Sequence, residues 1–255
     1  MKKKKIKNPL IRRIPKELIG DWKKYLVVFL FLVLTIGFVS GMYVANESMI
    51  TSANEGVTKY KQEDGHFELK KQADATLLSA IETGEKADFK ATKTTLYENF
   101  FRNEEEDYNN DGKKDGTIRV FAKTKDINLA CMLQGSFPQK ADEIAIDRMH
   151  ADNVGIKVGD TVTVSGETYK VVGLLAYVNY STLHEKTTDL MFDALKFDVA
   201  MVTQDGFDRL HKSIHYTYAW KYETEPADEA GEKTRSDNFM RALLTQVVVA
   251  VSYTH

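Results

Sequence analysis

Residues 25–45, YLVVFLFLVLTIGFVSGMYVA, decide how this chain is organised, because they form a continuous run without a charged side chain. A helix rises about 1.5 Å per residue, so a run of this length spans roughly 30 Å, the thickness of the hydrocarbon core of a bilayer. The residues are apolar all round the helix, whereas a helix of a soluble core has one apolar stripe. The sequence therefore predicts a transmembrane helix over Tyr25–Ala45.

A cleaved signal peptide is the alternative interpretation of this N-terminus. Signal peptides have an apolar region of about 7–15 residues, followed by small residues before the cleavage site. Here the apolar run is longer, and Tyr43 stands where a site ending at Ala45 requires a small side chain. These features favour a retained membrane anchor.

Basic residues are concentrated before the predicted span. Residues 1–24 contain ten Lys or Arg and two acidic residues, so the positive-inside rule places them in the cytoplasm and the main domain outside. Apolar residues recur among them at near-helical spacing, which predicts an amphipathic segment on the inner leaflet, with a disordered tail as the alternative. The residues expected to fix the orientation are Arg12, Arg13, Lys16, Lys23 and Lys24.

The part of the chain beyond the span is acidic. Without residues 1–24, the 35 Lys and Arg and 37 Asp and Glu fall to 25 basic and 35 acidic residues, a net charge of −10. This balance gives no indication of nucleic-acid binding, whereas the basic N-terminus suits anionic membrane lipids. The single cysteine, Cys131, cannot form an internal disulfide and is expected to be a small buried apolar residue.

The residues after the span predict a stalk and then an α+β domain. No helix breaker occurs before Gly56, so the membrane helix is expected to continue as an extracytoplasmic stalk over residues 46–62, with the domain at 63–248. Hydrophobic periodicity predicts the elements of this domain. Strands are expected at 66–69, 94–101, 117–122, 129–133, 143–147, twice within 157–175 about a Ser165-Gly166 turn, at 197–202 and at 216–222, and helices at 75–82, 148–154, 205–210 and 237–246.

One polar loop carries a calcium-like pattern. Residues 107–115, DYNNDGKKD, resemble the first nine positions of an EF-hand loop, but the twelfth position, normally a bidentate acid, is Ile118. The same residues suit a polar turn between strands equally well. The run Glu104–Asp107 is expected to be a solvated loop. The candidate calcium ligands are Asp107, Asn109, Asp111 and Asp115.

Other catalytic and metal-binding patterns are incomplete. His211 and His215 are four residues apart, but no cysteine or carboxylate at a recognised spacing completes a zinc site, so structural or surface histidines are expected. The chain has neither the phosphate-binding motif Gly-x-x-x-x-Gly-Lys-Ser/Thr nor a hydrolase nucleophile motif. We therefore expect no catalytic residue and no cofactor in this chain.

Three stretches together resemble bacterial ABC-transporter permeases of the MacB/FtsX type. Residues 11–49 are similar to the N-terminus and first membrane helix of these permeases. Residues 135–175, GSFPQKADEIAIDRMHADNVGIKVGDTVTVSGETYKVVGLL, resemble the core of their extracytoplasmic domain. The linking stretches EDGHF at 63–67 and LMFDALKFDVAM at 190–201 fit the same group, so the resemblance extends to about Val247.

The resemblance implies a permease in the cytoplasmic membrane, with its N-terminus inside and its main domain outside. It implies three further membrane helices, a cytoplasmic ATPase subunit, and a second permease copy or homologue forming a dimer. Such a protein couples ATP hydrolysis by its partner to export or to mechanical work. The connection Tyr177–Asp193 is a candidate contact for substrate or for the partner subunit, with an ordinary surface loop as the alternative.

The chain departs from this family after Val247, where the family's further helices would follow. Residues 251–255, VSYTH, match the translation of a transposon end used in sequencing libraries. We therefore expect residues 249–255 to be the artificial terminus of a fragment. The alternative function is a single-pass, membrane-anchored protein whose outer domain binds a ligand or acts as a sensor.

Overall fold

The computed structural model describes residues 13, 19–84, 94–180, 182–186, 188–224 and 226–253, without the side chains of 248–253. The chain divides into two units, residues 1–55 and 56–255. Of the residues expected to fix the orientation, Arg13, Lys23 and Lys24 are exposed. Arg12 and Lys16, like most of the predicted amphipathic segment, lie outside the described residues.

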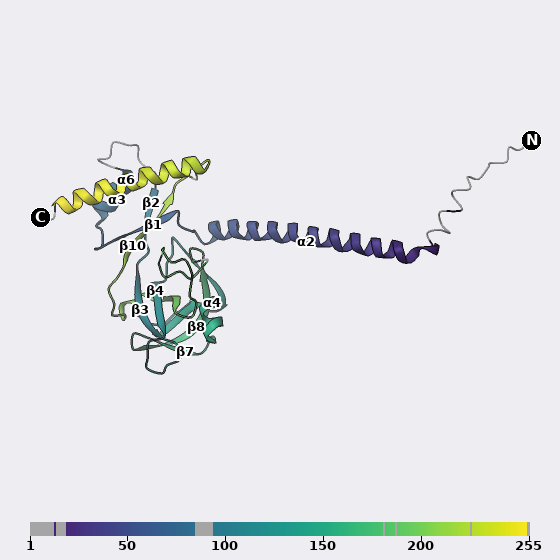
Figure 1. Cartoon of the computed structure of the whole chain (residues 1–255). Coiled ribbons are helices and arrows are strands. Elements are labelled where there is room, and N and C mark those ends of the chain that lie inside the picture. Colours follow the sequence, from purple (N-terminus) through teal and green to yellow (C-terminus); the bar gives the residue numbers. More distant parts are fainter. Residues whose placement is uncertain are drawn as a thin grey trace, which may run out of the picture. The chain divides into compact units, whose positions relative to one another are not determined.

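The helix α2 (Trp22–Lys59) contains the predicted span and most of the predicted stalk in one element (Figure 1). Every residue from Trp22 to Glu55 is exposed. By length and composition this helix can cross a membrane, a property that it shares with signal sequences near an N-terminus. It ends where Lys61 adopts a left-handed conformation (φ 48°) and the Gln62 N–H donates to the Val57 carbonyl at 3.0 Å.

A seven-stranded sheet forms most of the second unit, in the order β5-β8-β6-β9-β4-β3-β7. The strand β7 pairs with β3 and also with the first residues of β8, so the sheet closes into a barrel, and β5 pairs with the later part of β8. The pairs β4–β9 and β6–β8 are parallel, and the others are antiparallel. The strands are β3 (Phe101–Asp107), β4 (Gly116–Ala122), β5 (Ala130–Gly135), β6 (Glu143–Asp147), β7 (Thr161–Val164), β8 (Glu167–Tyr177) and β9 (Phe197–Val202).

The predicted hairpin of β7 and β8 is confirmed. Ser165 and Gly166 both have positive φ (47° and 87°), as a two-residue turn that matches the twist of the strands requires. Alternate residues on both strands point into the barrel, and the side chains of Val162, Val164 and Tyr169 are fully buried.

A smaller antiparallel sheet has the order β1-β10-β2, from β1 (Gly65–Leu69), β2 (Thr94–Glu98) and β10 (Tyr216–Tyr222). The helices α3 (Ala75–Thr83) and α6 (Glu229–Tyr253) contact each other beside this sheet (Figure 1). Aromatic side chains dominate the core of this part of the domain, which contains Phe67, Ile81, Tyr218, Trp220, Tyr222, Phe239 and Leu243.

The short helices α4 (Arg148–Val154) and α5 (Gln204–Asp208) contact strands of the barrel. The carboxylate of Asp147 accepts hydrogen bonds from the N–H groups of Met149 and His150 and so caps the start of α4. Gly155, with φ 83°, ends the helix, as the sequence predicts. The α+β class is therefore confirmed.

Some sequence predictions are wrong. The run Glu104–Asp107 is the end of β3 and not a solvated loop, because strand alternation turns Glu104 and Glu106 toward the barrel interior, where both are buried. The predicted strand 94–101 is two elements, since Asn99 separates β2 from β3 and its N–H donates to the Thr217 carbonyl. Cys131 is half-buried instead of buried, and its Sγ accepts a hydrogen bond from the Tyr60 hydroxyl at 2.8 Å.

The last helix begins at Glu229, eight residues before the predicted start at Asp237. The carboxylate of Asp228 accepts a hydrogen bond from the Gly231 N–H at 2.7 Å, and the Asp228 carbonyl accepts one from the Glu232 N–H at 2.9 Å. These contacts start the helix within a polar stretch that has no hydrophobic periodicity.

Candidate functional site

Residues 60–64, here called the connector, follow α2 and hydrogen-bond to both sheets. On the barrel side, the carbonyl groups of Tyr60 and Lys61 accept hydrogen bonds from the N–H groups of Leu129 and Asn128 at 2.8 and 3.0 Å. On the other side, the Asp64 N–H donates to the Trp220 carbonyl on β10 at 2.9 Å. The connector therefore joins the end of α2 to both parts of the domain.

Asp64 strengthens the attachment of the connector to β10. Its Oδ2 accepts a hydrogen bond from the Tyr222 N–H at 2.6 Å, and its Oδ1 lies 2.7 Å from the Lys221 Nζ. Both side chains of this ion pair are mostly buried. Hydrogen bonds that involve charged groups are stronger than neutral ones, so this end of the connector is firmly held.

Glu63 contacts Asn128 on the barrel side of the connector and His66 on the other side. Its N–H donates to the Asn128 Oδ1 at 3.0 Å, and its carboxylate accepts from the Asn128 Nδ2 at 2.6 Å. The other carboxylate oxygen lies 2.8 Å from Nδ1 of His66 on β1. The hydrogen bond from His66 to Glu63 raises the pKa of His66 above its usual value, against the lowering effect of burial.

A cleft of about 710 Å³ is lined by residues of both sheets and of the connection that follows β8. Its lining residues come from the connector, β1, β3, β4, β10 and residues 179–189. They are Glu63, His66, Glu68, Asn99, Phe101, Asn103, Arg119, Phe121, Asn179, Tyr180, Thr182, His184, Glu185, Lys186, Asp189, His215 and Thr217.

Arg119 on β4 holds the connection 177–193 against the cleft. Its Nε donates to the Asn103 Oδ1 at 3.0 Å, and its two terminal nitrogens donate to the Tyr180 hydroxyl at 3.0 Å and the Glu185 carbonyl at 2.9 Å. Its guanidinium also lies 4.4 Å from the centroid of the Phe101 ring. Such a fork of donors is specific to arginine, so Arg119 positions the connection.

His215 also lines the cleft and is fixed by two contacts. Its ring stacks on Phe101, with 4.6 Å between the centroids and 7° between the planes. Its Nδ1 lies 2.8 Å from the Glu68 Oε1. The cleft thus combines histidine–carboxylate pairs with aromatic rings, an arrangement that suits the binding of a polar ligand with both donors and acceptors.

Seven of the residues that line the cleft belong to the predicted contact segment Tyr177–Asp193. The next residues of the segment do not line the cleft. The side chains of Leu190 and Met191 are 98% and 84% exposed. The segment therefore has one polar part in the cleft and one apolar part on the surface. A role in contacting substrate or a partner remains a proposal.

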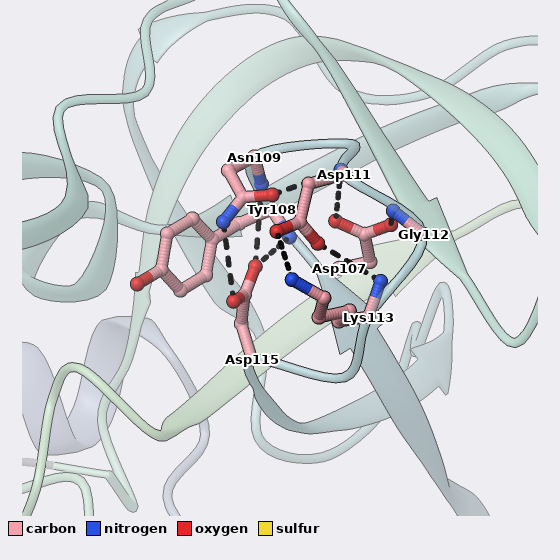
Figure 2. Close-up of polar contacts among 7 residues, drawn as sticks. All are labelled: Asp107, Tyr108, Asn109, Asp111, Gly112, Lys113 and Asp115. Atoms are coloured by element: carbon pink, nitrogen blue, oxygen red, sulfur yellow. Dashed lines mark hydrogen bonds and ion pairs between the residues drawn. The ribbon is translucent and has the colours of Figure 1, made fainter.

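The EF-hand-like loop has the hydrogen bonds of a polar turn (Figure 2). The carboxylate of Asp107 accepts from the N–H groups of Asp111 and Gly112, at 3.1 and 2.8 Å. Asp115 accepts from the N–H groups of Tyr108 and Asn109 and from the Asn109 side chain. These contacts explain the conformation of the loop without an ion, and calcium binding stays a prediction.

The two histidines considered for zinc are not on a helical face. His215 forms an isolated bridge with Phe101, and His211 is exposed in the turn before it.

The sequence analysis did not predict a different group of possible metal ligands. In the part of the chain that the structure describes, Glu106, His150 and Asp198 are buried together. The charged Asp198 within the apolar strand FDVAMV was the one sequence signal that could have indicated it.

No family model matches this chain, and no curated protein matches it. Two solved structures are similar to it. The periplasmic region of MacB from Actinobacillus actinomycetemcomitans shares 10% identity over 62% of this chain and 70% of that chain, with a TM-score of 0.35. The extracellular domain of the noncanonic ABC-type transporter YknZ from Gram-positive bacteria shares 13% identity over 70% of this chain and 92% of that chain, with a TM-score of 0.35.

At these TM-scores the likeness assigns no role to any residue of the cleft. One neighbour is the periplasmic region of MacB, and the other is the extracellular domain of an ABC-type transporter.

Proposed function

We propose that this chain is the N-terminal part of a permease subunit of an ABC transporter. Residues 1–24 lie in the cytoplasm, α2 crosses the cytoplasmic membrane, and residues 63–248 form the domain outside. A separate ATPase subunit and a second permease copy or homologue are its partners, and ATP hydrolysis by the ATPase drives export or mechanical work. The resemblance of residues 11–49 and 135–175 to MacB/FtsX-type permeases supports this function.

The connector is the observation that carries the proposal. It follows directly on an apolar helix, and it is bonded to the barrel at Asn128 and Leu129 and to the smaller sheet at Trp220 and Tyr222. A displacement of the helix end would therefore act on both walls of the cleft at once. This is the linkage that a permease needs if work done at the membrane is to change an outer binding site.

The orientation follows from the charges next to the span. Lys23 and Lys24 precede Tyr25, whereas the residues after Ala45 carry no such basic cluster. In intact cells, a membrane-impermeant maleimide is expected to label a cysteine introduced at Ser52 and not one introduced at Asn8, both in a Cys131→Ser background. Labelling of Asn8→Cys alone would reverse the orientation, and loss of the N-terminal segment from the mature protein would establish a signal peptide.

The partner is tested by purification of the gene product from its native membrane. The tagged protein in mild detergent is expected to co-purify with a subunit that carries a Walker A motif, and the complex is expected to hydrolyse ATP. Replacement of the Walker A lysine in that subunit should abolish hydrolysis and keep the complex. Recovery of the protein without any nucleotide-binding subunit, even after cross-linking in the membrane, would contradict the proposal.

A single-pass sensor is the second candidate, and the cleft is the observation that favours it. The paired His66–Glu63 and His215–Glu68 side chains form a binding surface that needs no ATPase. A sensor should bind its ligand equally well in membranes with and without ATP. A permease is expected to change its ligand affinity when its ATPase partner is trapped with nucleotide.

A further inference from the structure

Three ionisable side chains meet inside the barrel. Glu106 comes from β3, His150 from α4 and Asp198 from β9, and each is fully buried with 0% exposure. One ligand atom of each residue lies within 4.8 Å of the others. A buried group of charged residues is costly unless the charges are compensated, so this cluster requires an explanation.

The strand register brings the two carboxylates to the same face. Glu106 pairs with Val164 on β7, and Asp198 pairs with Ile118 on β4. Directly paired residues share a face of the sheet, and both Val164 and Ile118 belong to the core of the barrel. The two acids therefore point into the barrel, where His150 reaches them from the first turn of α4.

His150 and Asp198 are each held by one side-chain atom and present another without a hydrogen-bond partner, and Glu106 presents both of its carboxylate oxygens in this way. The His150 Nδ1 lies 2.7 Å from the Ala194 carbonyl, and the Asp198 Oδ1 accepts from the N–H groups of Asp147 and Val199. Within the described part of the chain, the His150 Nε2, the Asp198 Oδ2 and both carboxylate oxygens of Glu106 have no hydrogen-bond partner. A carbonyl only accepts, so Nδ1 carries a proton and Nε2 is left free to bind a metal.

The contact between His150 and Glu106 is longer than a charge-assisted hydrogen bond. The His150 Nε2 is 3.3 Å from the Glu106 Oε1. A charge-assisted N–H···O bond has a length of about 2.7–2.9 Å. Two ligands at about 2.0–2.1 Å from a tetrahedral zinc ion lie about 3.3 Å apart, which is the observed spacing.

The charges of the three side chains also favour a divalent cation. Two carboxylates with one imidazolium leave a buried net charge of −1, whereas two carboxylates, a neutral imidazole and a divalent cation are neutral. A divalent cation therefore balances the charge of the two carboxylates in their ionised form.

We propose that Glu106, His150 and Asp198 bind a divalent transition metal ion, with Zn²⁺ as the best fit. The ion ties β3, α4 and β9 together inside the barrel and stabilises a domain that has no disulfide. Glu106 also borders a cavity of about 390 Å³, whose lining includes residues 112–114, Thr163, Ser165 and Gly166. This site is independent of the proposed transport function.

The metal content of the whole protein is the first test. The full chain, purified in detergent without chelator, is expected to contain about one equivalent of metal by mass spectrometry. After removal of the metal with EDTA, added Zn²⁺ should raise Tm by about 5–10 °C. Co²⁺ should produce the visible absorption of a tetrahedral site, which Zn²⁺ then removes. No bound metal together with no shift in Tm and no Co²⁺ spectrum would overturn the proposal.

Variants identify the ligands. His150→Asn and Glu106→Gln are expected to lose the metal and the shift in Tm, whereas His211→Asn, at an exposed histidine, should keep both. Unchanged Zn²⁺ binding in His150→Asn would overturn the assignment. If the variants do not fold, the Co²⁺ spectrum of the unmodified chain decides, because the intensity of its visible bands distinguishes a four-coordinate site from an octahedral aqueous ion.

Discussion

Glu63 and Asn128 bind each other through both a backbone and a side-chain hydrogen bond, with lengths of 3.0 and 2.6 Å, across 65 residues of sequence. Asn128 is 1% exposed and has φ 47°, a conformation in which glycine is free of strain. This pair fixes the connector on the barrel, and its loss should loosen the link between α2 and the cleft.

Asn128→Gly removes both side-chain hydrogen bonds and keeps the backbone conformation. We expect the free energy of unfolding to fall by about 1–3 kcal/mol, since a buried polar group of Glu63 loses its partner. Denaturant unfolding of the full chain in detergent measures this value. Lys61→Gly is the matched control, because Lys61 also has positive φ (48°) and the change should be neutral or slightly stabilising. Equal stability of Asn128→Gly and the unmodified chain would show that the pair does not hold the connector.

The stability contributed by His66 should depend on pH. Glu63 raises the pKa of His66 in the folded protein above 6.5, so the protonated ring is the stabilised form. Its contribution is fully present below pH 6.5 and is lost as pH rises through the raised value. Histidine NMR titration of the full chain should show a His66 pKa above 6.5 that falls in Glu63→Gln, where burial and Arg119 lower it and Glu68 alone raises it. An unchanged His66 titration in that variant would contradict the assignment, and the His211 resonance serves as the control.

Arg119→Lys should release the connection after β8. Lysine cannot reach Asn103, Tyr180 and Glu185 at the same time, so residues 179–189 should exchange amide hydrogens faster, by about tenfold or more. Hydrogen exchange with mass spectrometry measures this change. Arg148→Lys, at an exposed residue of α4, should leave the same peptides unchanged. Protection of 179–189 that survives in Arg119→Lys would mean that other contacts hold the connection.

Asp115 tests the two interpretations of the 107–115 loop. If the loop is a polar turn, Asp115→Ala should lower the free energy of unfolding by about 1–2 kcal/mol through the loss of its three hydrogen bonds, with or without calcium. A Tm that rises with Ca²⁺ in the unmodified chain and not in Asp111→Asn would instead establish a calcium site. Thermal unfolding with Ca²⁺ and with EDTA distinguishes the two.

Local patterns predicted the local features of this fold. A uniformly apolar run indicated the long helix, and alternation around Ser165-Gly166 indicated the β7–β8 hairpin. Both patterns are formed by residues that are close together in the sequence. The closure of the barrel depends on β7 pairing with both β3 and β8. Such a pairing between distant strands leaves no periodicity in the sequence.

The polar interior was unpredictable for the same reason. Glu104 and Glu106 lie in an acidic run that is typical of solvated loops, and only the neighbouring strands turn them inward. His150 stands on a short helix, 44 residues both from Glu106 and from the Ala194 carbonyl that orients its ring. The cleft likewise joins residues from Glu63 to Thr217, so it exists only once both sheets are in place.

The most direct test of the account is the distance between the two sheets during the ATPase cycle. Spin labels at Thr95 on β2 and Thr168 on β8, both exposed, report on the two sheets in a Cys131→Ser background. In the complex with its ATPase, electron-electron double resonance should show different distance distributions with and without trapped nucleotide, and Asn128→Gly should reduce the difference. An unchanged distribution in a complex that hydrolyses ATP would contradict the claim that the connector transmits movement from the membrane helix to the cleft.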